Sequence, residues 1–412
     1  MSQSHVINPW PRFRIGDVAR VQSGYAFKSE WFVPDGVRLL RNVNVSQGRV
    51  VWDDSAFLPP NRREEFSTFE LSEGDIVLSL DRPVVSGGLK VARITERDLP
   101  ALLLQRVGRF IVQAEVVPDY LYFFLQSVEF IRAITAHDQS LGVPHVSPRQ
   151  VEEVELPLPP LAEQRRIAGR LREQLAEVAK ARTAMQAQLA AAQALPAASL
   201  RAVFQSPVAD AWPTELLGDV TRIGAGVTLG RDLRGRETRL VPYLRVANVK
   251  DSWLDLSDVK EVEATEREIE DCQLRYGDLL LTEGGDRDKL GRGMYWQDQL
   301  PECIHQNHIF RVRFDLTNFD PDFVSLQVSS EYGKAFFLAH AKQTTGIATI
   351  NRGVLTRFPL RTPPLADQRT IATRLAAELA EVTRLRESLS GKLETLDRLP
   401  AALLAQAFQG GQ

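Results

Sequence analysis

The sequence predicts an α+β protein made of two tandem repeats. Two α+β domains are separated by a pair of long antiparallel coiled-coil helices, in a pseudo-twofold arrangement. Three observations support this fold class. The phrase PPLAEQRRIA at 159–168 returns as PPLADQRTIA at 363–372. Other motifs recur at nearly the same shift. Each repeat also passes from a turn-rich part into a stretch dominated by the strong helix formers Ala, Leu, Arg, Glu and Gln.

The repeat extends over the whole chain of 412 residues. Motif pairs shifted by 202 to 204 residues are WP at 10–11 and 212–213, GDV at 16–18 and 218–220, GDIVLS at 74–79 and GDLLLT at 277–282, and PDYLYFFLQS at 118–127 and PDFVSLQVSS at 321–330. We therefore expect four segments: a first domain at 1–158, a first long helix region at 159–205, a second domain at 206–362 and a second helix region at 363–412.

Short apolar runs between glycines and turn residues fill the domain parts. GDIVLSL and KVARI predict strands. The stretch at 118–134 predicts a single helix that begins with Pro118 and Asp119. KQTTGIATIN at 342–351 predicts a polar loop ahead of the last strand of the second domain.

Each helix region carries one apolar seam. The residues of this seam are Leu171, Leu175, Val178, Met185 and Leu189 in the first copy and Leu375, Leu379, Val382, Leu389 and Leu393 in the second. Their spacing predicts helix pairing, with a helix of about 50 Å ahead of Pro196. Pro196 and Pro400 are expected to break or kink the helices. The alternative is that each helix packs only on its own domain.

The two copies keep their frame but differ in their loops. VQSGYAFKSEWFVPDG at 21–36 corresponds to IGAGVTLGRDLRGRET at 223–238. LDRPVVSGGLK at 80–90 corresponds to EGGDRDKLGRG at 283–293. Such a pattern favours two recognition domains on one rigid spacer, each with its own target.

These features resemble the DNA-specificity subunit of type I restriction–modification systems. The resemblance rests on the two PPLA-(E/D)-Q-R phrases, on SGYAFKS near the start and on the two GD strands. It implies two target-recognition domains, each bound to one half of a split, asymmetric site in double-stranded DNA, with the helices setting the spacer. It also implies two methyltransferase (modification) subunits that supply S-adenosylmethionine, and an endonuclease/translocase subunit as a further partner.

Candidate DNA contacts are the polar and basic residues and the glycines of the variable loops, since Lys, Arg, Asn and Gln bind phosphates and base edges. In the first domain they are Tyr25, Lys28, Arg41, Asn44, Arg82, Ser86, Lys90, Gln105, Arg106, His137, Gln139, Ser140 and His145. In the second they are Arg245, Asn248, Glu283, Gly284, Gly285, Asp286, Arg287, Lys289, Arg292, Gln306, Asn307, His308, Lys342, Thr344 and Thr345. Arg41 and Arg245 occur in both copies, which favours backbone positioning over sequence recognition.

Catalytic and metal-binding motifs are missing from the sequence. It has no G-x-x-x-x-G-K-[ST] phosphate loop. Its six histidines and two cysteines show no metal-ligand spacing. We therefore expect a subunit that is not an enzyme and has no cofactor or metal of its own.

The start of the sequence has no signal-peptide pattern, and no stretch is apolar enough for a membrane span. We therefore expect a cytoplasmic protein without a membrane partner. Two alternatives stay open. One is a metal-dependent nuclease using Asp278 and Glu283. The other is a coiled-coil adaptor whose globular ends bind proteins.

Overall fold

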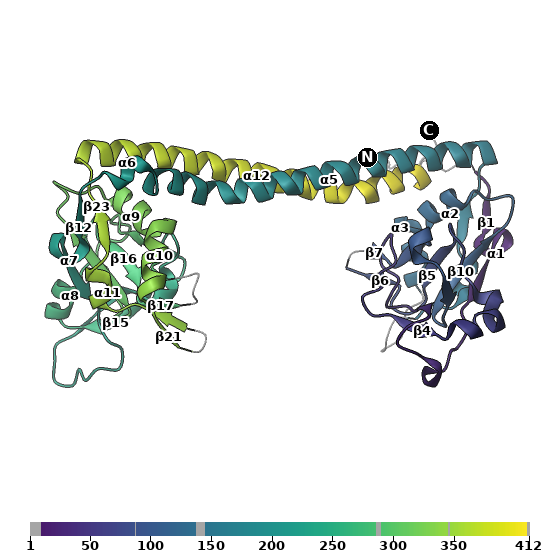
Figure 1. Cartoon of the computed structure of the whole chain (residues 1–412), viewed down its shortest axis with the longest axis horizontal. Coiled ribbons are helices and arrows are strands. Elements are labelled where there is room, and N and C mark those ends of the chain that lie inside the picture. Colours follow the sequence, from purple (N-terminus) through teal and green to yellow (C-terminus); the bar gives the residue numbers. More distant parts are fainter. Residues whose placement is uncertain (1–9, 87, 137–144, 286–289, 345–346, 410–412) are drawn as a thin grey trace, which may run out of the picture. The chain divides into compact units, whose positions relative to one another are not determined.

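The computed structural model describes residues 10–86, 88–136, 145–285, 290–344 and 347–409. These residues form two compact units. Unit 1 holds Met1–Gln186 and Gly391–Gln412, and unit 2 holds Ala187–Ser390. Each unit therefore consists of one α+β domain, the beginning of one long helix and the end of the other (Figure 1).

Unit 1 is built on two larger sheets, accompanied by two sheets of two strands each. A four-stranded antiparallel sheet has the order β2 (Ala19–Ser23), β10 (Val107–Val112), β5 (Ile76–Ser79) and β8 (Val91–Arg93). A three-stranded sheet has the order β4 (Ala56–Leu58), β3 (Val37–Leu40) and β9 (Ala101–Leu103). The remaining elements are β1 (Arg12–Arg14), β6 (Val84–Val85), β7 (Gly88–Leu89), β11 (Glu155–Pro157), α1 (Ile15–Val18), α2 (Pro118–Leu125), α3 (Val128–Thr135) and α4 (Pro148–Glu152).

Unit 2 repeats this plan. Its four-stranded sheet has the order β13 (Thr221–Ala225), β20 (Ile309–Phe314), β16 (Leu279–Thr282) and β18 (Gly293–Tyr295). Two three-stranded sheets follow: β15 (Lys260–Ala264), β14 (Arg239–Leu244) and β19 (Ile304–His305), and β17 (Gly284–Gly285), β22 (Ile347–Thr349) and β21 (Lys342–Thr344). The remaining elements are β12 (Thr214–Leu216), β23 (Pro359–Arg361), α6 (Pro207–Asp210), α7 (Leu217–Val220), α8 (Glu266–Cys272), α9 (Pro321–Ser329), α10 (Glu331–His340) and α11 (Arg352–Thr356).

A glycine marks the point in each unit where the chain leaves the first strand of the large sheet and meets the smaller sheet. A Cβ added to Gly24 would lie 2.3 Å from the carbonyl oxygen of Leu104, and one added to Gly226 would lie 1.8 Å from that of His305. Only glycine permits so close an approach of two backbones. The duplicated glycine therefore fixes how the two sheets meet in both units.

The predicted helix at 118–134 is wrong as a single element, because it is two helices. α2 ends at Leu125, and α3 begins after Ser127, whose hydroxyl accepts a hydrogen bond from the amide of Phe130 (3.2 Å). A serine side chain that caps a helix competes with continuation of the helix before it. Unit 2 repeats the break, with α9 ending at Ser329 and α10 beginning at Glu331.

The two long helices are α5 (Leu161–Phe204) and α12 (Leu365–Gln409). Of the two expected effects of the prolines, the break is wrong, because both helices continue through Pro196 and Pro400; a kink stays a prediction. A proline inside a helix costs about 3 kcal/mol. Beyond the prolines, Phe204 and Phe408 are 0% and 1% exposed. Burial of such a side chain contributes about 1.5–3 kcal/mol, which offsets most of this cost.

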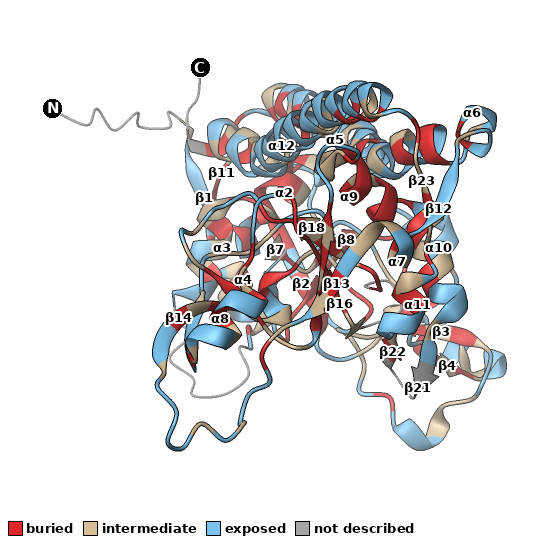
Figure 2. Cartoon of the chain, turned by 90° about the vertical axis from the view of Figure 1, so that its left-hand side faces the viewer, coloured by how far each residue is buried: buried red, intermediate tan, exposed pale blue. Residues whose placement is uncertain are grey.

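Inside each unit the long helices pack together and onto the domain. In unit 1, Leu171 of α5 shares a buried cluster with Leu404 and Phe408 of α12. Further along α5, Arg182 pairs with Asp397 (2.8 Å), so the two segments run antiparallel. Unit 2 contains the end of α5 and the beginning of α12, and these also pack together. One buried cluster contains residues 200, 203 and 204 of α5 and residues 372 and 375 of α12. Exposed residues cover the outward side of both helices (Figure 2).

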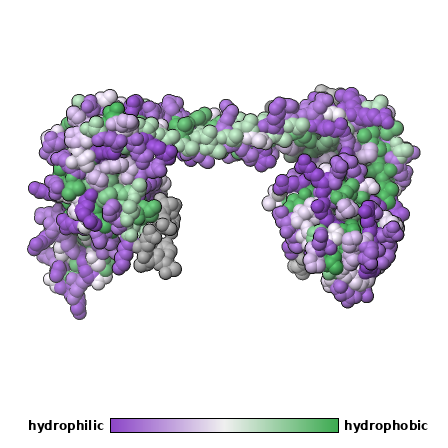
Figure 3. Space-filling model, in the orientation of Figure 1, coloured by the Kyte–Doolittle hydropathy of each residue, from purple (hydrophilic) through white to green (hydrophobic). Residues whose placement is uncertain are grey.

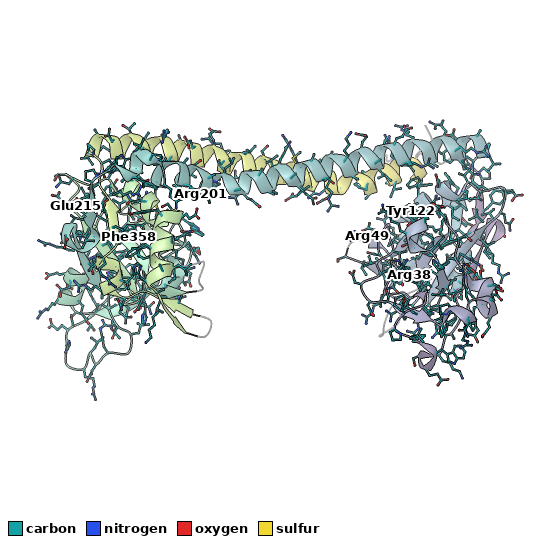
Figure 4. All side chains as sticks on the ribbon, viewed as in Figure 1. Arg38, Arg49, Tyr122, Arg201, Glu215 and Phe358 are labelled. Atoms are coloured by element: carbon teal, nitrogen blue, oxygen red, sulfur yellow. The ribbon has the colours of Figure 1, made fainter. Side chains whose placement is uncertain are left out.

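All ten residues of the predicted seam are buried or half-buried, whereas Arg182 and Arg386 in its gaps are exposed. Helix pairing and packing on the domain therefore occur together. At the far end of α5, Arg201 forms an ion pair with Glu331 of α10 (2.6 Å), and Phe358 lies in the interior of unit 2 (Figure 4).

The repeated PPLA phrase has a structural explanation in a buried glutamine. The side-chain nitrogen of Gln164 donates to the carbonyl oxygens of Glu115 (3.0 Å) and Pro159 (2.9 Å), and its oxygen accepts from the amide of Val117 (2.8 Å). Val117 is the residue that precedes α2.

Gln368 makes the corresponding three hydrogen bonds, to the carbonyl oxygens of Asn318 and Pro363 and from the amide of Asp320. In both copies this glutamine ties the first turn of a long helix to the first turn of a domain helix.

Candidate nucleic-acid interface

Two of the predicted contact pairs stabilise a turn in their own domain. Asn44 is 1% exposed; its oxygen accepts from the amide of Arg41, and its nitrogen donates to the carbonyl oxygens of Val51 and Asp54. The Arg41 guanidinium forms an ion pair with Asp54 (2.8 Å). Asn44 therefore has no free donor for a base, and we leave Arg41 and Asn44 out of the interface.

The same turn is built 204 residues later. Asn248 is 3% exposed and binds the amide of Arg245 and the carbonyl oxygens of Asp255 and Asp258. Arg245 forms an ion pair with Asp258 (2.9 Å). Identical internal contacts in both units explain why these residues occur in both copies, and we leave Arg245 and Asn248 out as well.

Three residues of unit 1 meet at the end of β5. The carboxylate of Asp81 accepts a hydrogen bond from Nη1 of Arg106 (2.6 Å) and lies 2.9 Å from Nδ1 of His145. The backbones of Asp81 and His145 also form a bridge. Although burial opposes its ionisation, the hydrogen bonds from His145 and Arg106 lower the pKa of Asp81. We call Asp81, Arg106 and His145 the Asp81 cluster.

Other predicted residues surround the Asp81 cluster. Arg82 is exposed and holds a left-handed backbone conformation (φ 44°). Lys90 is half-buried; burial lowers its pKa, while the charge of Asp81 opposes this shift. Ser86 and Gln105 are exposed. Basic side chains therefore gather around one buried carboxylate, an arrangement suited to a polyanion.

The two predicted residues near the start lie in different environments. Tyr25 is half-buried, with its ring centroid 5.0 Å from that of Phe27 and 4.8 Å from that of Phe66. Lys28 is exposed, and its ammonium lies 5.7 Å from the ring centroid of Trp31. Tyr25 therefore contributes to packing, whereas Lys28 is available for contacts.

Sequence reasoning missed a second cation beside Trp31. The guanidinium of Arg62 lies 4.2 Å from that ring and forms a bidentate pair with Glu65. Arg62 and Trp31 are separated along the chain by thirty residues without a shared motif, so no local signal could find them. Asp81 was also missed, because a single aspartate after a strand is indistinguishable from a turn residue.

Unit 2 repeats the frame of the Asp81 cluster with other side chains. The amide of Glu283 donates to the carbonyl oxygen of His308 (3.0 Å), and in unit 1 the amide of Leu80 donates to that of Arg106 (2.8 Å). Nδ1 of His308 lies 2.6 Å from the Glu283 carboxylate. The side chain of Gln306 accepts from the amide of Val246 (3.3 Å). Arg106 and His308 therefore occupy equivalent backbone positions.

Gly284 and Gly285 form β17, which pairs with β22. A Cβ added to Gly284 would lie 2.7 Å from Cγ2 of Thr349, so this glycine is required for strand packing. The stretch predicted as the KQTTGIATIN loop also contains strands, since β21 and β22 pair antiparallel. The prediction of a loop is therefore wrong. β22 forms a strand because it pairs with β17 as well as with β21, and the polar composition of the segment does not indicate these pairings.

The remaining predicted residues of unit 2 are placed as follows. Asn307 and Arg292 are half-buried, and Nε of Arg292 is buried without a hydrogen-bond partner in the described part of the chain. Lys342 is exposed, and the backbone of Thr344 lies in β21. The predicted contacts that lie outside the described residues are His137, Gln139, Ser140, Asp286, Arg287, Lys289 and Thr345. The visible faces of the domains are largely hydrophilic (Figure 3).

Nuclease chemistry finds no support in the described residues. They contain no group of three or more His, Cys, Asp or Glu side chains placed to hold a metal ion. Asp278 is 1% exposed and accepts two hydrogen bonds from Arg313 (2.7 and 2.6 Å) and one from the amide of Arg275. Asp278 therefore stabilises the GD turn. None of the helices in the described ranges is both long and apolar enough to cross a membrane.

Comparisons with known proteins agree with one another. Residues 7–184 match the family described as "Type I restriction modification DNA specificity domain". The EcoAI specificity subunit of Escherichia coli is 43% identical over 196 residues, which cover 46% of this chain and 33% of that protein. The chain thus spans about a third of the length of that relative.

A second relative aligns along the whole chain. The StySPI specificity subunit of Salmonella potsdam is 23% identical over 431 residues, covering 100% of this chain and 90% of that protein. The HsdS subunit of Thermoanaerobacter tengcongensis superposes with a TM-score of 0.63 at 18% identity, covering 98% of each chain. At this identity the likeness shows the fold alone, and it confirms the predicted fold class.

Proposed function

We propose that the chain is a DNA-specificity subunit of a type I restriction–modification system and that it selects the DNA sequence on which such a complex acts. One observation carries the proposal. Two units share one backbone frame, yet the equivalent position holds Arg106 in one and His308 in the other. A duplicated frame with different polar side chains is the arrangement expected for recognition of two different half-sites.

We propose that the chain itself performs no catalysis. Methylation then requires a partner methyltransferase that binds S-adenosylmethionine, and cleavage requires an endonuclease/translocase subunit. Two units of one plan offer two equivalent docking surfaces, which supports two methyltransferase subunits per chain. Since its target is DNA, we place the protein in the cytoplasm.

The long helices are proposed to set the spacer between the half-sites. α5 contains 44 residues and α12 contains 45, and each continues from one unit into the other. An α-helix rises about 1.5 Å per residue, so its length is a fixed physical quantity.

The net charge of −3 supports a further expectation. DNA affinity grows with the number of phosphates that a protein neutralises. The isolated chain should therefore bind DNA weakly, and the assembled complex should bind it tightly.

The test is base-resolved methylation. The chain is expressed with the methyltransferase subunit of the same system in a host without N6-methyladenine, and genomic N6-methyladenine is sequenced. We expect one motif made of two half-sites and a fixed spacer, present only when this chain is expressed. An identical methylation pattern without the chain would overturn the proposal.

A further inference from the structure

We propose that Asp81 positions Arg106 to recognise a guanine in the half-site bound by unit 1. This inference rests on the proposed function and deepens it, because it assigns one base contact and the residue that prepares it. Asp81 is a positioning residue in this scheme, and Arg106 makes the contact.

The Asp81 cluster has a buried carboxylate and an exposed guanidinium. The Asp81 side chain is 11% exposed, and that of Arg106 is 62% exposed. Arg106 holds a left-handed backbone conformation (φ 70°) between β9 and β10. Only its Nη1 atom is bound to another described residue, through the carboxylate. The guanidinium is therefore held at one corner, and none of the described residues binds its Nε or Nη2.

The open atoms match guanine. Arginine carries five N–H donors in a planar fork, and two parallel donors fit O6 and N7 of guanine in the major groove. A carboxylate that fixes the plane of the fork beforehand reduces the conformational entropy lost on binding.

The neighbours of the Asp81 cluster suit a DNA backbone beside the recognised base. Arg82 is exposed, and Lys90 is half-buried with a pKa lowered by burial. A phosphate near Lys90 would restore the charge that burial disfavours. His145 contacts the other oxygen of the Asp81 carboxylate and lies between α3 and α4 in the sequence.

Unit 2 supports the assignment by contrast. Its frame presents His308 against Glu283 (2.6 Å) where unit 1 presents Arg106 against Asp81. The acids come from different positions of the frame, because Glu283 is equivalent to Leu80 and not to Asp81. An acid still contacts the side chain at the shared position in both units, and the change from Arg106 to His308 at that position is suited to specificity.

The experiment repeats the methylation assay on the full chain with its methyltransferase, using Arg106→Ala, Asp81→Asn and two controls. Arg106→Ala should remove the preference for one G·C pair in one half-site, by roughly ten- to a hundredfold, and leave the other half-site unchanged. Asp81→Asn should relax the same position to a smaller extent, since the amide still accepts a hydrogen bond but carries no charge. Asp81→Glu should restore part of the preference.

The controls separate base recognition from general binding and from folding. Arg82→Ala should lower methylation at all sites without changing the motif. His308→Ala should change only the other half-site. Thermal unfolding of Arg106→Ala should show a cooperatively folded protein with a modestly lower melting temperature, because the exposed side chain is lost together with its hydrogen bond to Asp81.

An unchanged motif for Arg106→Ala in a folded, active complex would overturn the inference and leave the proposed function intact. A uniform loss of methylation for Arg106→Ala, equal to that for Arg82→Ala, would assign Arg106 to phosphate and also overturn it. A wild-type chain that specified no bipartite motif would instead overturn the proposed function.

Discussion

Replacement of Gln164 by alanine should loosen the junction between α5 and its domain. The side chain is 1% exposed and makes three hydrogen bonds of 2.8 to 3.0 Å. A hydrogen bond contributes about 1 kcal/mol net, and a buried group left without a partner costs about 1–3 kcal/mol. The free energy of unfolding of unit 1 should therefore fall by about 3 kcal/mol.

Hydrogen exchange measures this effect locally. The amide of Val117 loses its acceptor in Gln164→Ala, so its protection should fall by roughly a hundredfold, at about 1.4 kcal/mol for each factor of ten. Gln164→Glu keeps an acceptor for this amide. It also places an oxygen opposite two carbonyl oxygens, so it should destabilise the junction at least as much.

Gln186→Ala is the matched control, since this glutamine lies exposed on the same helix. Its effect should stay within about 0.5 kcal/mol. Equal effects of Gln164→Ala and Gln186→Ala, or unchanged protection at Val117, would refute the role of the buried glutamine and with it the explanation of the repeated phrase.

Three further predictions concern the GD turn, acid stability and the helices. Asp278→Asn should lower the stability of unit 2 by about 3 kcal/mol in chemical unfolding, because it breaks the buried pair with Arg313. The hydrogen bond from Arg231 lowers the pKa of Glu268 from 4.5 to about 2, so this pair stabilises unit 2 above pH 4.5 and loses its effect as the pH falls toward 2. Unfolding titrations over that range should show a loss that is larger by about 1–2 kcal/mol in the wild type than in Glu268→Gln, allowing for solvent screening, because other carboxylates of unit 2 titrate in both proteins. Insertion of four residues after Ala184 should lengthen α5 by about 6 Å and change the spacer of the methylated motif by one or two base pairs, with both half-sites unchanged; altered half-sites at a constant spacer would contradict the role of the helices.

Local features of the sequence were sufficient to predict the duplicated backbone frame. Gly24 and Gly226, Gln164 and Gln368, and the two GD turns recur because each satisfies a backbone requirement that no other residue meets as well. The apolar seams likewise reflect helix periodicity, which is local. Repeats of this kind determined the fold class without any knowledge of long-range contacts.

The helix breaks and continuations were decided by packing. Ser127 ends one predicted helix because its hydroxyl caps the next. Pro196 does not end α5, because burial of the side chain of Phe204 beyond it offsets most of the cost of the proline. Propensity alone predicts the opposite result at both positions.

The sequence by itself determined the two-unit plan, the long helices and the loops in which polar contacts had to be sought. Only the tertiary structure decided which polar residues are free, because that depends on which groups meet in space. Asn44 and Arg41 are bound to their own turn, whereas Arg106 is held through Nη1 by Asp81, 25 residues away, and its side chain stays 62% exposed. A hydrogen-bond partner is a property of position in space, and spacing along the sequence does not encode it.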